Sequence, residues 1–93
     1  MPKKHGAEFM MEFVEAYLDG EKNRLDWDLD FNHYLIEHYP KMEHDNSQMA
    51  GCFSYFLSEQ GFDKGEGLSD TDHKELINRQ YEKFKAAMHD FLC

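Results

Sequence analysis

The stretch of sequence that decides the fold is LDWDLDFNHYLIEHY, residues 25–39. Its first seven residues alternate strictly between apolar and acidic side chains, which is typical of a half-buried β-strand. The alternation ends at Phe31, because Tyr34, Leu35 and Ile36 follow with a different spacing. Three aspartates in seven residues are also unfavourable in a strand. The stretch therefore favours a helix.

On a helical wheel, the polar side chains of this stretch gather on one narrow face, and apolar side chains cover most of the remaining circumference. The polar face consists of Asp26, Asp30, His33 and Glu37. We therefore expect a central helix that is buried on most of its circumference. It should end before Pro40, because proline disfavours helical geometry in the residue that precedes it.

Three further segments carry apolar residues at helical spacing, near residues 7–19, 45–60 and 70–91. With the helix near residues 25–39, they make four amphipathic helices joined by mostly short connections. A chain of 93 residues with a hydrophobic fraction of 41% has room for one core. The sequence therefore predicts an all-α fold, a small four-helix bundle that forms a single domain over residues 1–93.

The ends of these segments carry residues that are typical of helix boundaries. Gly20 suits the position just after the first helix. Asn46 or Ser47 can cap the third helix, and Ser69 can cap the fourth. The glycine-rich stretch GFDKGEGL, residues 61–68, predicts the one clear loop.

Negative charge is concentrated in the middle of the chain. Residues 25–60 hold seven carboxylates and one base, a net charge of −6 within a total of −9. The flanks are nearly balanced, with four bases and five acids in residues 1–24 and five bases and seven acids in residues 61–93. A surface of this kind repels nucleic acid and attracts a basic surface. We therefore expect a basic protein partner and no nucleic acid.

The candidate partner-binding residues lie on the central helix. They are Asp26, Trp27, Asp28, Asp30 and Glu37. A tryptophan surrounded by carboxylates has the composition of an interface hot spot that faces arginine or lysine. If the central helix is buried throughout, however, Trp27 belongs to the core, and both interpretations stay open at this point.

No catalytic or cofactor-binding motif is recognisable, so we expect neither an enzyme nor a cofactor. The stretch GFDKGEGLSD fits neither a calcium-binding EF-hand loop nor a phosphate-binding loop. Two cysteines, Cys52 and Cys93, are too few for a disulfide scaffold. Cys52 lies between Gly51 and Phe53 in an acidic protein, a setting typical of a small buried hydrophobe rather than a reactive thiolate.

A metal site is an alternative use of the polar side chains. Asp30, His33 and Glu37 share one helix face, and the spacing Asp-x-x-His recurs at Asp70 and His73. Two helices that each offer a carboxylate and an imidazole can hold a metal in a helical bundle. A solvated polar face explains the same residues, so we predict no metal.

The chain also resembles the small acidic helical immunity proteins that bacteria make against their own nuclease bacteriocins, in particular the colicin D-type group. The resemblance rests on length, helical pattern and acidity. It also rests on FVEAYLDGEKNRLDWDLDF, residues 13–31, in which a glycine separates an apolar stripe from an acid-and-aromatic helix. It implies a one-to-one inhibitor whose carboxylates occupy the cationic, phosphate-binding groove of a toxin.

These observations lead to one leading hypothesis and two alternatives. The leading hypothesis is a non-enzymatic bacterial protein whose acidic face blocks a basic partner such as a nuclease toxin. The first alternative is a helical accessory or regulatory domain, either a monomer or a homodimer, with charge that only maintains solubility. The second is a metal-binding bundle. We expect a cytoplasmic protein without membrane contact, because neither a secretory signal nor a membrane-spanning apolar run is present.

Overall fold

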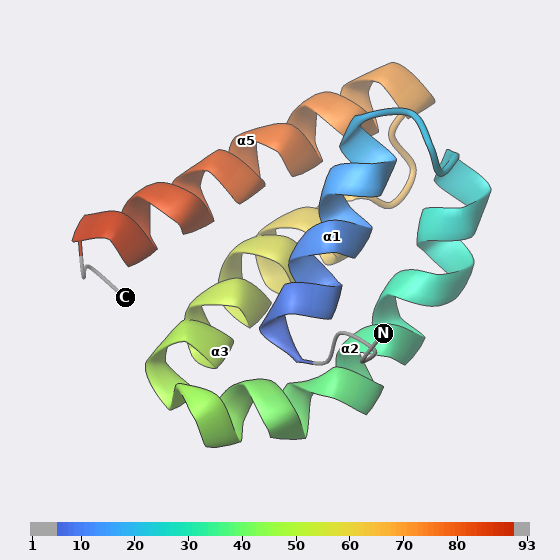
Figure 1. Ribbon diagram of the computed structural model, residues 1–93. Helices are drawn as coiled ribbons and strands as arrows, with labels where there is room; N and C mark the ends of the chain where they lie inside the picture. The colour runs from blue at the N-terminus through green and yellow to red at the C-terminus, as the bar shows by residue number, and fades with distance from the viewer. Residues whose placement is uncertain (1–5, 91–93) are drawn as a thin grey trace. The chain divides into compact units, whose positions relative to one another are not determined.

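The computed structural model of the chain describes residues 6–90. The described residues form helices and no strand, which confirms the predicted all-α fold class (Figure 1). In chain order the elements are α1 (Ala7–Leu18), α2 (Arg24–Asp45), α3 (Ser47–Phe53), the π-helix η1 (Ser54–Phe62), α4 (Asp63–Gly65) and α5 (Asp70–Asp90). The chain consists of two compact units that divide between Ala50 and Gly51 within α3. We call them unit 1 and unit 2 and describe each by itself.

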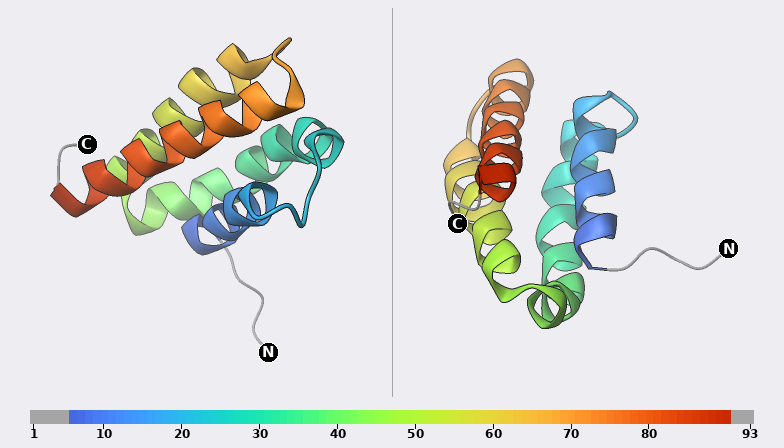
Figure 2. Two further views of the ribbon diagram at one scale, coloured as in Figure 1. Left: turned by 90° about the horizontal axis from the view of Figure 1, so that it is seen from above. Right: turned by 60° about the vertical axis from the view of Figure 1, so that its left-hand side comes forward.

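In unit 1, α1 and α2 lie side by side and pack through an aromatic core (Figure 2). Trp27 is fully buried at its centre. The indole stacks on Phe31 with ring centroids 4.5 Å apart, and it lies 4.8 Å from Tyr17 and 5.5 Å from Phe13. Each such ring removes roughly 150–250 Å² from water. Burial of these four rings therefore holds α1 against α2.

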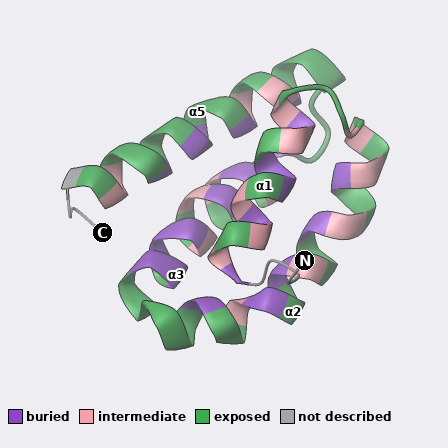
Figure 3. Cartoon of the chain, in the orientation of Figure 1, coloured by how far each residue is buried: buried purple, intermediate pink, exposed green. Residues whose placement is uncertain are grey.

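The helix α2 buries one stripe rather than most of its circumference, so that part of the prediction is wrong. The stripe is made of Trp27, Phe31, Leu35, His38 and Met42. Leu25, Leu29 and Ile36 are instead 63%, 67% and 70% exposed. The physical reason is that α1 is the helix of unit 1 that packs extensively against α2, and one helix covers one stripe of another. Figure 3 shows this alternation of buried and exposed positions along the helices.

The prediction that the second helix ends before Pro40 is also wrong, because α2 continues through Pro40 to Asp45. A proline inside a helix removes one backbone hydrogen bond and costs about 3 kcal/mol. Burial continues on both sides of it, with His38 8% exposed and Met42 fully buried. The backbone N–H of Gly6 also donates to His38 Nδ1 at 3.1 Å. Packing of the next turn therefore offsets the proline.

The predicted helix boundaries are confirmed at three places. Gly20 has a φ of 89°, the left-handed geometry that follows many helices. The side chain of Asn46 accepts a hydrogen bond from the backbone N–H of Met49 at 3.0 Å and so caps α3. Ser69 Oγ accepts one from the backbone N–H of Asp72 at 3.2 Å at the start of α5. Local sequence therefore determines where these helices begin and end.

In unit 2, η1 and α5 lie side by side, and Phe53 packs edge-on against Phe84 at 5.2 Å. The loop that was predicted to begin at residue 61 is wrong, because helical structure continues to Gly65. A Cβ on Gly61 would lie 3.0 Å from Ile77 Cδ1, and one on Gly65 would lie 2.7 Å from His73 Cδ2. These two glycines allow close approach to α5 instead of ending the helix.

Cys52 is buried in the core, as predicted, and it is also disulfide-bonded. The other cysteine, Cys93, lies outside the described residues. Among residues 6–90, no helix combines the length and the apolar character that crossing a membrane requires.

The close approach in unit 2 leads to a testable pair of substitutions. Gly65→Ala should lower the free energy of unfolding by about 1–3 kcal/mol, because the added methyl group overlaps the buried ring of His73. Gly51→Ala is the matched control: nothing lies within 4 Å of its added methyl group. Alanine there should raise the free energy of unfolding by about 0.5–1 kcal/mol through helix propensity. Urea unfolding measures both, and equal effects of the two variants would contradict the packing described.

Candidate functional site

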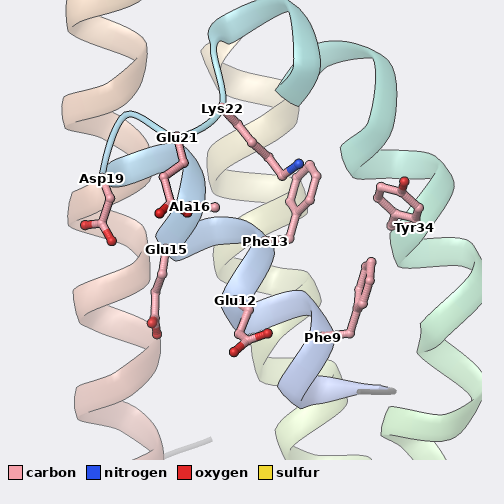
Figure 4. Close-up of a pocket in the computed structure, with 9 residues that line it drawn as sticks. All are labelled: Phe9, Glu12, Phe13, Glu15, Ala16, Asp19, Glu21, Lys22 and Tyr34. Atoms are coloured by element: carbon pink, nitrogen blue, oxygen red, sulfur yellow. The ribbon is translucent and has the colours of Figure 1, made fainter. Parts of the chain in front are cut away.

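A pocket of about 510 Å³ lies in unit 1, between the outer face of α1 and the middle of α2 (Figure 4). We call it the acidic pocket. It is lined by Phe9, Glu12, Phe13, Glu15, Ala16, Asp19, Glu21, Lys22 and Tyr34. All nine residues belong to unit 1, so the pocket is complete within one compact unit.

The floor of the acidic pocket is aromatic. Tyr34 of α2 packs edge-on against two rings of α1, with its centroid 5.0 Å from that of Phe9 and 5.5 Å from that of Phe13. Phe9 and Phe13 are four residues apart and therefore share one face of α1. Phe13 is buried, whereas Phe9 and Tyr34 are half-buried. Two of the three rings thus retain surface on which a ligand can pack.

The rim of the acidic pocket is negatively charged. Glu12, Glu15 and Asp19 recur at spacings of three and four residues, so they follow one exposed face of α1. Glu21 adds a fourth exposed carboxylate just after the turn. Against these four acids stands one base, Lys22, which leaves the pocket with a net charge of −3. Such a rim attracts cations.

Lys22 shows what the aromatic floor can hold. Its ammonium nitrogen lies 5.5 Å from the centroid of the Phe13 ring, within the range of a cation–π contact. Figure 4 shows its side chain reaching toward that ring. An aromatic floor beneath carboxylates offers a cation both a ring face and charge-assisted hydrogen bonds. The chemistry of the pocket therefore suits the side chain of arginine or lysine.

Two of the predicted partner-binding carboxylates are engaged in local helix structure. Asp26 forms a capping box with Asn23: its backbone N–H donates to Asn23 Oδ1 at 2.8 Å, and its carboxylate accepts from the backbone N–H of Asn23 at 3.3 Å. Asp28 accepts from Arg24 Nε, which lies 3.2 Å from both carboxylate oxygens. These two residues thus stabilise the first turns of α2.

The other two predicted carboxylates lie beside the acidic pocket. Asp30 and Glu37 flank Tyr34 at spacings of four and three residues, so all three share one face of α2. Asp30 is half-buried, and Glu37 is exposed with its carboxylate 3.9 Å from His38 Nε2. The acidic surface of the pocket therefore continues from α1 onto α2.

Trp27 is not a surface residue, and its predicted role in partner binding is wrong. The side chain is fully buried, and rings of α1 and α2 pack against it. A residue with no exposed area cannot contact a partner on the surface. Of the two interpretations that the sequence left open, the core one is correct.

The metal-binding alternative finds no support in the described part of the chain. No group of three or more histidine, cysteine, aspartate or glutamate side chains in residues 6–90 is arranged to hold a metal ion. Its proposed ligands were Asp30, His33, Glu37 and His73. His73 is 1% exposed and packs against Gly65, which makes it a packing residue of unit 2.

Sequence reasoning missed the α1 side of the site. The charge count placed Glu12, Glu15, Asp19 and Glu21 in a flank, residues 1–24, whose lysines nearly balanced them. The aromatic floor was assigned entirely to the core, because Phe9 and Phe13 belong to the apolar stripe. A signal was nevertheless present: three of these acids recur at helical spacing on the face that is not apolar.

Comparison with known proteins gives no relative for this chain. No protein-family model matches it, and no curated protein or solved structure is similar to it. The resemblance to immunity proteins therefore stays a prediction. What the site can do follows from its own residues alone.

An experiment can distinguish the carboxylates that stabilise the first turns of α2 from those that lie beside the acidic pocket. Asp26→Ala should lower the free energy of unfolding by about 0.5–2 kcal/mol, because it removes the capping-box acceptor and a favourable charge at the helix N-terminus. Asp30→Ala is the control and should change it by less than about 0.5 kcal/mol. Urea unfolding decides the matter, and an Asp30→Ala loss as large as that of Asp26→Ala would refute the division of roles.

Proposed function

We propose that the chain is a non-enzymatic module that binds a basic protein partner. The acidic pocket and the adjoining Asp30 and Glu37 form its contact surface. The observation that carries the proposal is the pocket itself, in which four exposed carboxylates surround an aromatic floor. The pocket has a net charge of −3. The arrangement suits a cationic side chain that inserts from a partner.

The charge balance of unit 1 supports this proposal. Residues 1–50 contain eleven carboxylates and five bases. Three of these bases make a contact inside the unit: Arg24 pairs with Asp28, Lys41 Nζ lies 2.9 Å from Asp45, and Lys22 lies over Phe13. The surplus of six acids produces a negative potential that attracts a basic surface and repels nucleic acid.

The energetics of such a surface indicate how binding should behave. A single exposed ion pair contributes only about 0–1 kcal/mol, so affinity requires several pairs and the aromatic floor together. Long-range attraction between opposite charges accelerates association and is screened within about 8–10 Å at physiological salt. Binding should therefore weaken as ionic strength rises.

The finer form of the proposal is an immunity-type inhibitor. In it, the partner is a nuclease toxin whose groove binds phosphates through lysine and arginine. Carboxylates of the acidic pocket would occupy those phosphate positions by charge-assisted hydrogen bonds and so exclude the nucleic acid. The net charge of −9 and the resemblance of residues 13–31 to colicin D-type immunity proteins support this form.

Affinity capture with matched charge variants tests the proposal. The immobilised wild-type chain should retain a basic protein from a lysate of its source cells at about 50 mM NaCl and lose it near 500 mM, because salt screens exposed charges. Asp19→Lys with Glu21→Lys, both on the pocket rim, should capture several-fold less. Mass spectrometry identifies and quantifies the retained protein.

The control double variant is Glu59→Lys with Glu66→Lys in unit 2, which changes the net charge by the same amount at exposed positions outside the pocket. It should capture as much as the wild type. Equal losses in the two double variants would show that net charge alone binds the partner, and the pocket would lose its proposed role.

A further inference from the structure

An apolar row runs along the outer face of α2. Leu25, Leu29 and Ile36 are 63%, 67% and 70% exposed. At about 100° per residue they fall within a sector of about 40°, and at about 1.5 Å per residue they span about 16–17 Å along the helix. We call these three residues the α2 strip.

Single exposed leucines are common on protein surfaces, but an aligned row is not. Five large apolar side chains of the described residues are exposed, and three of them form the α2 strip. The buried stripe of α2 lies on the opposite side of the helix, so the α2 strip is not the exposed edge of the hydrophobic core. A row of this kind is typical of a surface that binds another molecule.

The two margins of the α2 strip differ in charge. On the helical wheel, Asp28 lies about 80° to one side of the strip's centre, where its carboxylate is paired with Arg24. Asp26 and Glu37 lie about 80–100° to the other side. The strip therefore has an apolar centre and one acidic margin, and this margin continues to Tyr34 and the acidic pocket.

This charge pattern decides which occupant fits. A second copy of the chain carries the same net charge of −9, and three side chains are far fewer than a stable interface of about 1,000 Å² requires. An anionic lipid surface would be repelled by the acidic margin. A helix with apolar residues at matching positions and lysine or arginine along one side is complementary to the centre and to the acidic margin.

We propose that the α2 strip is the docking site for an amphipathic basic helix of the partner. Leu25, Leu29 and Ile36 contact its apolar face, and Glu37 contacts its basic margin. The inference rests on the proposed function and deepens it, because it states the form in which the basic partner presents its charges. In this proposal, three aliphatic side chains provide the apolar contact with the partner that the sequence had suggested for Trp27.

Two synthetic peptides test the inference on the full chain. One is a helical peptide with leucines at the spacing of the α2 strip and lysines along one margin. The other has the same composition in scrambled order, so that its leucines share no face. Fluorescence anisotropy at about 50 mM NaCl should give an affinity at least about tenfold higher for the amphipathic peptide, because burial of several leucines is available only to it.

Protein variants then locate the site. Leu25→Ser, Leu29→Ser and Ile36→Ser combined should reduce binding of the amphipathic peptide to the level of the scrambled one. Tyr55→Ser with Leu68→Ser removes the exposed apolar side chains outside the strip and should leave binding unchanged. The triple variant should unfold at the same urea concentration as the wild type, because the strip is exposed. A marked loss of its stability would show that the strip is covered within the chain and would overturn the inference.

The outcomes separate this inference from the proposed function. If both peptides bind equally at low salt and release at high salt, the basic-partner proposal stands and the α2 strip has no docking role. If neither peptide binds at low salt, the proposed function fails and the inference fails with it. If sedimentation shows a dimer that the triple variant abolishes, the occupant is a second copy, and the inference is overturned.

Discussion

The packing of Trp27 against α1 is the interaction on which the rest of unit 1 depends. Its indole lies within 5.5 Å of the rings of Phe13, Tyr17 and Phe31, measured between centroids, and is fully buried. This contact fixes the register of α1 on α2. The same register brings Tyr34 edge-on to Phe9 and Phe13 and so builds the floor of the acidic pocket. The residue that the sequence offered as a surface anchor therefore acts from inside, by positioning the rings that a ligand can reach.

Charge and apolar area are separated on unit 1 in a way that one pair of helices explains. Two helices can bury only the stripes that face each other, so the outer faces of α1 and α2 remain in solvent. The carboxylates occupy these outer faces, and Arg24 and Lys41 are paired within α2. What remains is an acidic surface with two places where apolar side chains are open to contact, the acidic pocket and the α2 strip. Protein–protein interfaces combine an apolar centre with a polar rim, so such a surface is consistent with the proposed protein partner.

Periodicity and capping chemistry were sufficient to predict the helices, because both are local properties of the chain. Ser69 and Asn46 cap the helices that the sequence assigned to them. The predictions that were wrong all concerned tertiary packing, that is, which helix surfaces contact each other. From the sequence, Gly65 was assigned to a loop, but in the structure it allows His73 to pack closely against the helix. Likewise, α2 has the sequence pattern of a buried helix, but within unit 1 it packs mainly against α1. Half of the candidate site was missed for the same reason, because its rim lies on α1 and its floor requires a ring from α2.

The most direct test of the central claim, that unit 1 binds cations through the acidic pocket, is an amide chemical-shift titration with a short arginine-rich peptide. The shifts should be concentrated in residues 9–22 and 30–37 and should diminish as salt is added. Acidic positions of α5, such as Glu82, should move much less. Shifts spread evenly over all exposed carboxylates of both units, or no shifts at low salt, would contradict the central claim.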